Sequence, residues 1–314
     1  MKALLHYRAS PGFRRCLDAL RPDWLSLAVV DEAESARFRA ELADTDALLH
    51  VLKPISAEDI AAGPRLKLIQ KIGVGVNTID LDAARKHGAA VCNMPGTNSQ
   101  AVAEMTLMLM LAALRRVSVF DPETRAGRGW TVDLAQFDGI GEIAGRTVGL
   151  IGYGEVGRRL APVLAALGAT VLYTATKPKP DAQAAWRTLP ALLGESDIVS
   201  LHLPLTRDTE KLIDASTLAA MKPGAVLVNT ARGGLVDEPA LIAALRSGRL
   251  RAAGLDVFAA EPIDPTNPLF QLQNVVVMPH IAWLTPETLE RSLVIAFENC
   301  RRLKEGAPLL NRIV

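Results

Sequence analysis

A glycine loop between an apolar strand and a helix constrains the fold of this chain more than any other segment. The apolar run 147–151 leads directly into Gly152-Tyr153-Gly154-Glu155-Val156-Gly157, and a helix follows to about Gly168. In such a loop the first glycine permits a tight turn, the second lets the backbone approach a pyrophosphate, and the third allows close helix–strand packing. The phosphates then meet N–H groups at the positive end of the helix. The loop therefore predicts a dinucleotide-binding βαβ unit.

Short apolar strands alternate with amphipathic helices along the whole chain, which is typical of parallel sheets. Before the glycine loop we expect strands at residues 3–5, 47–51, 66–69 and 89–92, and helices near 34–43, 56–62 and 80–87. From the loop onward we expect strands at residues 147–151, 170–173, 198–201, 225–228, 253–257 and 275–278. These six near-continuous apolar strands favour a doubly wound sheet that is covered by helices on both faces.

The chain of 314 residues is long for a single core, so we expect two α/β domains. A long helix near residues 99–117 follows the first, smaller domain. Residues 122–145 are rich in glycine and charge and are interpreted as an excursion rather than a packed layer. The final helix, near residues 286–305, has no strand after it, and we expect it to return to the first domain.

Composition excludes several classes of protein. Lys and Arg number 35 against 34 Asp and Glu, so no excess of positive charge indicates a nucleic-acid partner. Cys16, Cys92 and Cys300 match neither a disulfide framework nor a metal-ligand spacing. The apolar run at the start is too short for a signal peptide, and residues 105–114, the longest apolar stretch, are about half of a membrane span. We therefore expect a cytoplasmic protein with no metal and no membrane partner.

The turn after the second strand of the dinucleotide unit bears on the choice of cofactor. An acidic residue there, about 20 positions after the first glycine, would bind the ribose hydroxyls of NAD. This chain instead reads Ala175-Thr176-Lys177, and the next carboxylate is Asp181. Because small hydroxyl residues followed by lysine accept a 2′-phosphate, we predict NADP(H), with NAD(H) as the alternative. The lysines have a second interpretation, in which they only keep a surface loop soluble.

Three charged residues follow three successive strands of the predicted sheet. Arg232, Glu261 and His280 come after the strands at 225–228, 253–257 and 275–278. Parallel sheets bind ligands at this end of their strands. Arginine holds a carboxylate bidentately, and histidine can deliver a proton near neutral pH. A carboxylate beside that histidine favours its protonated form, so the set predicts the reduction of a 2-oxo acid by hydride transfer.

At this point the chain resembles the D-isomer-specific 2-hydroxyacid dehydrogenase family over nearly its whole length. The resemblance rests on the glycine loop and on ordered motifs elsewhere in the chain. These are residues 71–80 (KIGVGVNTID), 95–104 (PGTNSQAVAE), 202–206 (HLPLT), 229–237 (NTARGGLVD), 254–258 (GLDVF) and 279–283 (PHIAW).

The resemblance implies the architecture and the site residues of that family. It implies a flavodoxin-like, discontinuous substrate domain of residues 1–98 and 284–314, a Rossmann cofactor domain of residues 99–283, and a homodimer formed through the cofactor domain. Arg232, Glu261 and His280 would be the catalytic triad, and the backbone of Val74 and Gly75 would hold the substrate carboxylate. The implied cofactor contacts are Gly152, Gly154, Glu155, Val156, Gly157, His202, Pro204, Thr230, Ala231, Asp256, Ala282 and Thr106. Closure of the two domains would exclude water before hydride transfer.

Two positions depart from the family pattern. Its usual ribose-binding aspartate aligns with Ala175, and relatives with small residues and then a base at this turn resemble the NADP-using glyoxylate and hydroxypyruvate reductases. Trp283 stands three positions after His280, where many members carry a small residue. This indole has three interpretations: it narrows the substrate pocket, forms a subunit contact, or packs in the core.

Glyoxylate or hydroxypyruvate is therefore the predicted substrate, and several alternatives stay open. A D-lactate or D-3-phosphoglycerate dehydrogenase is the nearest one, although we see no obvious basic cluster for a phosphate. A dinucleotide-sensing corepressor that binds peptides is an alternative of a different class. The chain carries no long tail of the kind such corepressors usually have.

Overall fold

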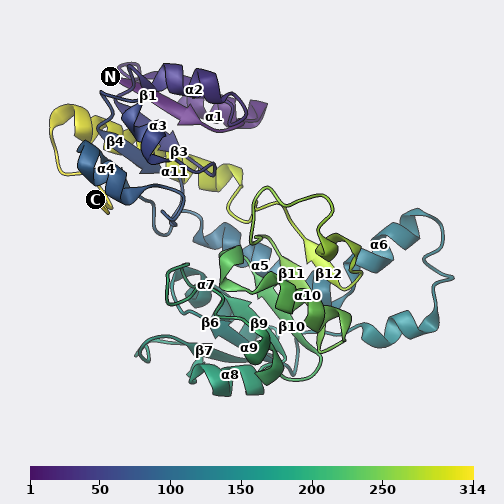
Figure 1. Ribbon diagram of the computed structural model, residues 1–314. Coiled ribbons are helices and arrows are strands. Elements are labelled where there is room, and N and C mark those ends of the chain that lie inside the picture. Colours follow the sequence, from purple (N-terminus) through teal and green to yellow (C-terminus); the bar gives the residue numbers. More distant parts are fainter. The chain divides into compact units, whose positions relative to one another are not determined.

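The computed structural model describes all of residues 1–314, which divide into two compact units. Unit 1 comprises Met1–Asn98 and Trp283–Val314, and unit 2 comprises Ser99–Ala282. The chain thus begins in unit 1, passes through unit 2 and returns to unit 1 with its last helix (Figure 1). The domain boundary expected between residues 283 and 284 differs by one residue from this division.

Unit 1 is built on a five-stranded parallel sheet. Its strands are β1 (Lys2–His6), β2 (Ser26–Val30), β3 (Ala47–His50), β4 (Leu68–Lys71) and β5 (Ala90–Cys92). They lie in the order β2-β1-β3-β4-β5, which is the order of flavodoxin-like folds. The strands β3, β4 and β5 are buried along their whole length, as expected for a parallel sheet covered on both faces.

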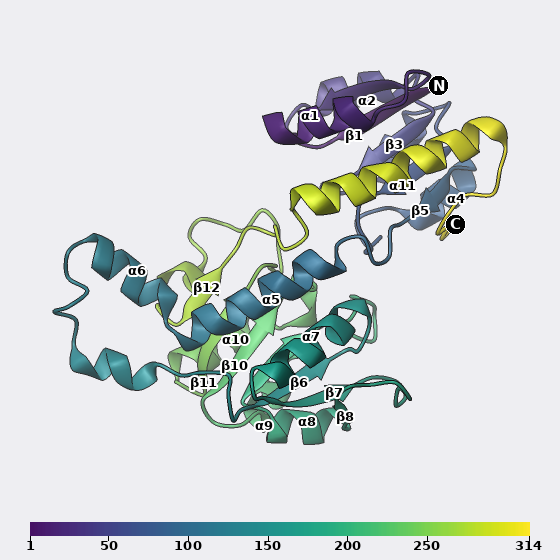
Figure 2. The ribbon, with the colours of Figure 1, turned by 180° about the vertical axis from the view of Figure 1, so that it is seen from behind.

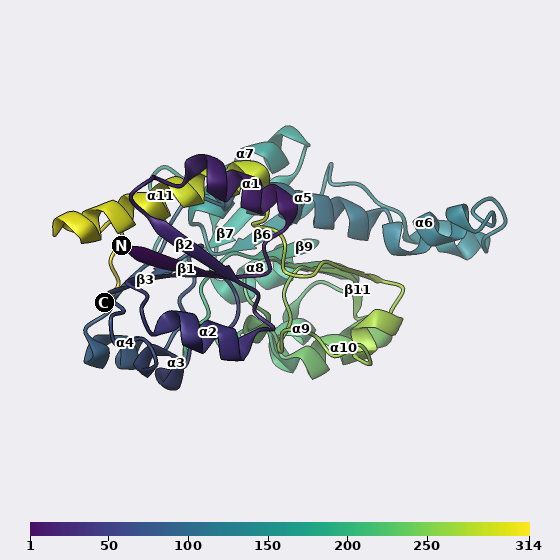
Figure 3. The ribbon, with the colours of Figure 1, turned by 90° about the horizontal axis from the view of Figure 1, so that it is seen from above.

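Helices cover both faces of this sheet (Figure 3). One face carries α1 (Pro11–Leu20) and α11 (Pro286–Glu305); the other carries α2 (Ser35–Leu42), α3 (Ala57–Ala61) and α4 (Leu81–His87). The helix α11 begins at a Thr285 cap and ends at Gly306, whose φ of +69° suits glycine. After it, the N–H of Ile313 donates to the carbonyl of Val91 at 2.7 Å. The final helix therefore returns to the first unit, as predicted.

Unit 2 contains a seven-stranded parallel sheet. Its strands are β6 (Thr147–Ile151), β7 (Thr170–Thr174), β8 (Ala185–Trp186), β9 (Ile198–Leu201), β10 (Ala225–Asn229), β11 (Leu250–Leu255) and β12 (Val275–Val277). Their order is β12-β11-β10-β9-β6-β7-β8, so the chain reverses its direction of travel across the sheet between β6 and β9. Such a reversal leaves a crevice at the carboxyl ends of the strands, where doubly wound sheets bind ligands.

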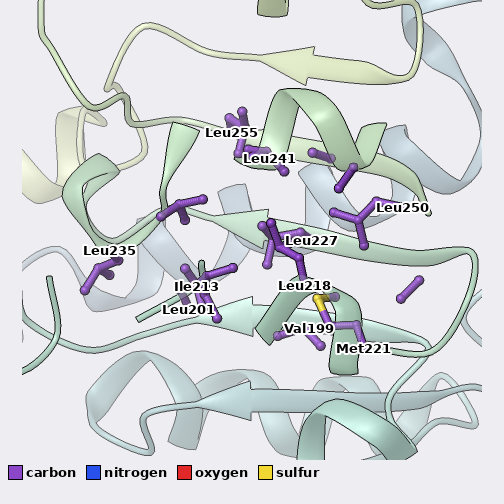
Figure 4. Close-up of a cluster of buried hydrophobic side chains, with 14 of the residues drawn as sticks. Val199, Leu201, Ile213, Leu218, Met221, Leu227, Leu235, Leu241, Leu250 and Leu255 are labelled. Atoms are coloured by element: carbon purple, nitrogen blue, oxygen red, sulfur yellow. The ribbon is translucent and has the colours of Figure 1, made fainter. Parts of the chain in front are cut away.

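Two separate cores cover the faces of the unit 2 sheet. The helices α5 (Ser99–Leu114) and α7 (Glu155–Ala166) pack on one face, in front of the sheet in Figure 2. The helices α8 (Leu189–Glu195), α9 (Ala215–Ala220) and α10 (Glu238–Arg246) pack on the other. Successive strand residues alternate between the two cores: Val226 faces α5 and α7, whereas Leu227 joins the cluster drawn in Figure 4.

The segment between α5 and β6 forms an arm that extends away from this sheet (Figures 1 and 2). We define the arm as residues 117–139, which include α6 (Val117–Arg125) and the 3-10 helix η1 (Leu134–Gly139). The rings of Phe120 and Phe137 stack at 5.3 Å between centroids. Trp130 and Leu134 are nevertheless 86% and 78% exposed. This segment therefore lies outside the packed layers, as predicted, but it contains short helices. Its large apolar side chains are exposed because no other part of unit 2 packs on them.

Some elements differ from the sequence prediction. The strand expected at residues 253–257 begins at Leu250 and ends at Leu255, because the ladder with β10 continues past the charged Arg251. The predicted long helix ends at Leu114 rather than near residue 117. The elements α1, β2 and β8 were not predicted; β8 has only two residues, and both are exposed.

The structure contains no helix that is both long and apolar enough to cross a membrane. Cys16, Cys92 and Cys300 are all free thiols.

A buried histidine in unit 1 generates a prediction about stability. His6 is 1% exposed, its ring stacks on Phe38 at 3.8 Å, and neither ring nitrogen has a hydrogen-bond partner. Burial, together with the charge of Lys53, lowers the pKa of His6 from 6.5 to about 4. Between these values the unfolded chain binds the extra proton, so stability falls as pH drops from 6.5 towards 4.

We expect His6→Phe to remove this dependence, since phenylalanine keeps the stacked ring and cannot be protonated. Wild type should lose about 3 kcal/mol more unfolding free energy than the variant between pH 7 and pH 3.5. Urea unfolding of both proteins across that range measures the difference, with His87→Gln at the end of α4 as the control. Equal pH slopes for wild type and His6→Phe would contradict the assignment.

Candidate active site

The glycine loop joins β6 to α7 in a conformation that leaves room for a pyrophosphate. Gly152 has a φ of +98°, and a Cβ there would lie 2.3 Å from the carbonyl oxygen of His202. A Cβ on Gly157 would lie 3.0 Å from the carbonyl oxygen of Gly152, which accounts for the close packing predicted for it. Gly154 caps α7, and a Cβ on it would meet nothing within 4 Å.

The first turn of α7 supplies donors towards that open space. The N–H groups of a first helical turn have no partner inside the helix, and the positive end of the helix dipole lies there. Glu155, Val156 and Gly157 are the first three residues of α7, so their predicted place beside a dinucleotide agrees with this geometry. The residues present therefore fit the phosphates of a nicotinamide dinucleotide.

The turn after β7 carries no carboxylate. Ala175 follows the last residue of β7, and Thr176 and Lys177 are exposed. The turn is held by its neighbours: the N–H of Lys179 donates to the hydroxyl of Tyr173 at 2.6 Å. An arginine that the sequence reasoning did not single out lies nearby on α7. The guanidinium of Arg158 lies 5.7 Å from the ring centroid of Tyr153, whose ring is 4.3 Å from that of Tyr173.

Two hydroxyls join α5 to the strand end that carries the arginine of the predicted triad. Thr106 of α5 is fully buried, and its hydroxyl lies 2.8 Å from that of Thr230, directly after β10. At the next strand, His202 follows β9, and its Nε2 lies 2.9 Å from the hydroxyl of Ser200. Burial lowers the pKa of His202 to about 3, so this ring is neutral at physiological pH. Pro204 follows it as an exposed residue.

Asn229 shapes the turn that presents Arg232. Its side-chain oxygen accepts from the N–H of Ala231 at 3.0 Å, and its amide donates to the carbonyl of Arg232 at 2.8 Å. Asn229 is 1% exposed, so these bonds are shielded from water. The guanidinium of Arg232 donates to the carbonyl of Ala231 at 2.6 Å. Burial lowers the pKa of Arg232, Glu261 opposes that change, and the group stays a cation.

A close approach of two backbones brings the arginine turn to the loop after β11. A Cβ on Gly233 would lie 1.9 Å from the carbonyl carbon of Phe258, so no other residue fits at position 233 without displacing that loop. The same loop continues to Glu261, whose Oε1 accepts from the N–H of Phe258 at 2.9 Å. The glycine therefore allows the turn that carries Arg232 to pack against the loop that carries Glu261.

Glu261 and His280 form the closest polar pair of the candidate site. The Oε2 of Glu261 lies 2.5 Å from Nδ1 of His280, and the side chains are 32% and 20% exposed. Burial raises the pKa of Glu261, but the hydrogen bond and charge of His280 outweigh it and lower the pKa overall. Glu261 is therefore an anion at neutral pH. It holds Nδ1 of the imidazole and thereby orients the ring.

Asp256 fixes the backbone next to His280. It is fully buried, and its two oxygens accept from the N–H groups of Ile281 and Ala282, both at 2.9 Å. Burial raises the pKa of Asp256, although the two N–H donors favour the anion. His280 has a φ of +56°, a conformation that few residues other than glycine adopt. The bonds to Asp256 help to hold His280 in it, a positioning role that the sequence did not reveal.

The expected substrate residues of unit 1 follow β4. The N–H groups of Val74 and Gly75 make no hydrogen bond within the protein, and Val74 is 44% exposed. Asn93 holds this loop by donating to the carbonyl of Val74 at 2.8 Å. Adjacent free N–H groups in a loop are suited to an anion such as a carboxylate.

Trp283 lies in unit 1, where it packs. It is 7% exposed, and its ring meets that of Tyr7 edge-on at 6.0 Å between centroids. Of the three interpretations open to the sequence, this geometry favours packing.

Within unit 2, therefore, the structure brings Arg232, Glu261 and His280 together at the ends of the adjacent strands β10, β11 and β12. Asn229 and Arg158 were missed as candidates. A signal existed for each: Asn229 ends a buried apolar strand as a polar residue, and Arg158 directly follows the last glycine of the loop.

Known proteins resemble the chain in both sequence and structure. The family described as the D-isomer specific 2-hydroxyacid dehydrogenase, NAD binding domain, matches residues 107–282. A D-3-phosphoglycerate dehydrogenase of Mycobacterium leprae is 41% identical over 90% of the chain, which spans only 54% of that protein's length. A glyoxylate reductase of Aeropyrum pernix is 40% identical over 84% of the chain and 81% of its own length.

The crystal structure of the TT0316 protein from Thermus thermophilus covers the whole of both chains, at 39% identity and a TM-score of 0.89. The family match covers more than half of the chain and includes the glycine loop, Arg232, Glu261 and His280. The chain therefore belongs to the D-isomer specific 2-hydroxyacid dehydrogenase family.

Proposed function

We propose that this protein reduces a small 2-oxo acid to the D-2-hydroxy acid, with a nicotinamide dinucleotide as the hydride donor. The observation that carries the proposal is the pair formed by Glu261 and His280 beside Arg232, in the same unit as the glycine loop. A bound nicotinamide supplies the hydride, and the protein's own residues bind the substrate, polarise its carbonyl group and supply the proton.

The charges of the triad match the reduction of a carbonyl group. Arg232 binds the substrate carboxylate and polarises the carbonyl oxygen, because its fork of donors matches planar oxygen pairs. As the carbonyl carbon receives the hydride, Nε2 of His280 gives its proton to the developing alkoxide. Glu261 stabilises the imidazolium before that transfer and orients the ring. In the reverse direction, the same nitrogen takes the proton from the hydroxyl.

Other residues support binding of the reactants. We expect the N–H groups of Val74 and Gly75 to bind the substrate carboxylate. Trp283 packs against Tyr7, and we expect the same side chain to border the substrate site. Thr106, Thr230, Ala231, His202 and Pro204, with Asp256 and Ala282, are the proposed residues around the nicotinamide half of the cofactor. His202 suits this place, since its neutral ring adds no charge beside the nicotinamide.

NADP(H) is the proposed cofactor. Ala175 leaves the turn after β7 without a carboxylate that would repel a 2′-phosphate, and Thr176 and Lys177 are exposed beside it. Arg158 is a second cation near this turn, over the ring of Tyr153. NAD(H) is the alternative, as the family description names NAD.

Glyoxylate or hydroxypyruvate is the proposed substrate, supported by the relatives named glyoxylate reductase, which the chain spans for about four fifths of their length. D-3-phosphoglycerate is a second candidate, because proteins named for it are up to 41% identical. D-lactate is the remaining candidate of the same class. We place the reaction in the cytoplasm.

Initial rates with NADPH and NADH test the cofactor and substrate together, using glyoxylate, hydroxypyruvate and pyruvate, and D-3-phosphoglycerate in the oxidative direction. We expect a higher kcat/KM with NADPH and with glyoxylate or hydroxypyruvate. Ala175→Asp should lower kcat/KM for NADPH at least about tenfold, since a carboxylate would repel the 2′-phosphate. Ala144→Asp, on an exposed loop of unit 2, is the control. A clear preference of wild type for NADH would overturn the assignment.

The proton donor is tested by His280→Ala. Loss of general acid catalysis should lower kcat by about 10² to 10⁴, while the Kd for NADPH changes little. Glu261→Gln should lower kcat in the same direction, because the imidazolium loses its anionic partner. Glu210→Gln, on the surface of unit 2, provides the control. Full turnover by His280→Ala would remove this residue from the mechanism.

We further propose that the protein is a homodimer and that the arm takes part in the interface. Trp130 and Leu134 are large apolar side chains that unit 2 leaves exposed, and exposed apolar patches mark interfaces. Leu134→Asp should shift the sedimentation of the protein from dimer to monomer at micromolar concentration. The matched control, Val294→Asp, alters an exposed residue of α11 in unit 1 and should leave the dimer intact. A monomeric wild type would contradict the proposal.

A further inference from the structure

The segment between β7 and β8 carries the residues proposed to select the cofactor, and its backbone contributes little to its own support. Residues 175–183 extend from the edge of the unit 2 sheet as a loop (Figures 1 and 2). We call this segment the cofactor turn. Within it the backbone makes one hydrogen bond to itself, from the N–H of Ala182 to the carbonyl of Lys179 at 3.2 Å. The shape of the cofactor turn therefore depends mainly on groups outside it.

Three aromatic side chains hold the cofactor turn, each through its polar tip. We refer to them as the aromatic clamp, which consists of Tyr153, Tyr173 and Trp186. The indole Nε1–H of Trp186 donates to the carbonyl of Ala175 at 3.3 Å. The hydroxyl of Tyr173 accepts from the N–H of Lys179 at 2.6 Å. The hydroxyl of Tyr153 accepts from the N–H of Gln183 at 3.0 Å, so the anchored positions are spaced evenly along the cofactor turn.

The two tyrosines of the aromatic clamp are part of the core of unit 2. Tyr153 and Tyr173 are buried, and their ring centroids are 4.3 Å apart. Both belong to the apolar cluster on the face of the sheet that α5 and α7 cover. Phenylalanine would fill this core without the cost of burying a hydroxyl, which needs a hydrogen-bond partner. The partners of both hydroxyls lie in the cofactor turn, so the hydroxyls add a hold on that turn to the packing of the rings.

The groups proposed to bind the 2′-phosphate lie between anchored positions. Thr176 and Lys177 stand between the carbonyl that accepts from the indole and the N–H that donates to the first tyrosine hydroxyl. Pro178 follows them, and its ring fixes one more backbone angle of the cofactor turn. The ring of Tyr153 also lies 5.7 Å from the guanidinium of Arg158, so the clamp contacts a cation of α7 as well. The backbone that carries Thr176 and Lys177 is therefore held at both ends.

A turn that is fixed in advance binds an anion better than a mobile one. A mobile turn has to be ordered when the ligand binds, and the conformational entropy lost in that step is subtracted from the affinity. A lysine acts on a phosphate mainly as a point charge, and the attraction between charges falls with distance. Displacement of the backbone that carries the lysine therefore weakens its contribution to phosphate binding.

We propose that the aromatic clamp positions the cofactor turn for the selection of NADP(H) over NAD(H). This inference rests on the proposed assignment of NADP(H) as the cofactor. Tyr153, Tyr173 and Trp186 act as positioning residues, because they fix the backbone of Thr176 and Lys177 before the 2′-phosphate binds. NAD(H) has a hydroxyl in place of that phosphate, so its affinity depends much less on the clamp. Loss of one hydrogen bond to the cofactor turn should therefore weaken the binding of NADPH selectively.

Isothermal titration of the whole protein, without substrate, tests the proposal with NADPH, NADH and adenosine 2′,5′-bisphosphate. Tyr173→Phe removes one hydroxyl and keeps the ring. It should raise the Kd for NADPH and for the bisphosphate at least about fivefold, and change the Kd for NADH by less than about twofold. Trp186→Phe should act in the same direction, because phenylalanine lacks the indole donor. The matched control is Trp24→Phe, which alters a tryptophan of unit 1 whose ring contacts Lys304, and it should leave every Kd unchanged.

Hydrogen exchange and steady-state rates separate this role from a merely structural one. Without cofactor, the N–H groups of the cofactor turn should exchange faster in Tyr173→Phe than in wild type, because the N–H of Lys179 loses its acceptor. At saturating NADPH, kcat should stay within about twofold of wild type, while KM for NADPH rises. A substitution that only destabilised the fold would instead weaken the binding of NADPH and NADH alike.

The proposal fails if Tyr173→Phe and Trp186→Phe keep the wild-type ratio of the Kd values for NADH and NADPH, whether both values stay constant or rise in parallel. If wild type binds NADH more tightly than NADPH, the cofactor assignment and the role of the clamp fail together. If wild type prefers NADPH and the variants keep that preference, only the role of the clamp is removed. Because binding is measured without substrate, the result decides the role of the clamp whether or not the protein reduces a 2-oxo acid.

Discussion

A buried carboxylate connects the strand-end loops on which the candidate active site depends. Asp256 accepts the N–H groups of Ile281 and Ala282, while its own N–H donates to the carbonyl of Asn229. Asn229 in turn shapes the turn of Arg232. One residue therefore couples the loops after β10, β11 and β12. Leaving buried N–H groups without this acceptor would cost about 1–3 kcal/mol for each, before any effect on chemistry.

Both units present backbone N–H groups in loops that follow parallel strands. In each, a parallel sheet ends in loops that expose backbone N–H groups: Val74 and Gly75 after β4, and the first turn of α7 after β6. Side chains behind the loops fix their shape, as Asn93 does for Val74 and Asn229 does for Ala231. Backbone donors suit carboxylates and phosphates alike, so both proposed ligand classes depend on the same property of βα loops.

Much of the candidate site could be predicted from the sequence, because parallel strands place their carboxyl ends at one edge. Knowing where β10, β11 and β12 end was enough to group Arg232, Glu261 and His280. The positions of the glycines followed from the requirements of a phosphate loop. The predicted final helix also matched α11 closely, since its threonine–proline start and glycine end are strong local signals.

What the sequence could not provide were features that arise only from tertiary contacts. The start of β11 was missed because pairing with β10, rather than local apolarity, carries the strand through Arg251. The role of Gly233 depends on the backbone of Phe258, which lies 25 positions later in the chain.

The backbone conformation of His280 lowers the stability of the fold, whereas the side chain at this position is the proposed proton donor. A left-handed residue other than glycine costs on the order of 1 kcal/mol, and the bonds of Asp256 and Glu261 to this segment offset that cost. For the fold alone, glycine at 280 would be the better residue. The loop after β12 thus keeps an imidazole in a strained conformation. Most substitutes, with glycine, asparagine and aspartate as the exceptions, would meet similar strain and would lack the ring's bond to Glu261. Variants that stabilise this loop would be expected to do so at the expense of its proton donor.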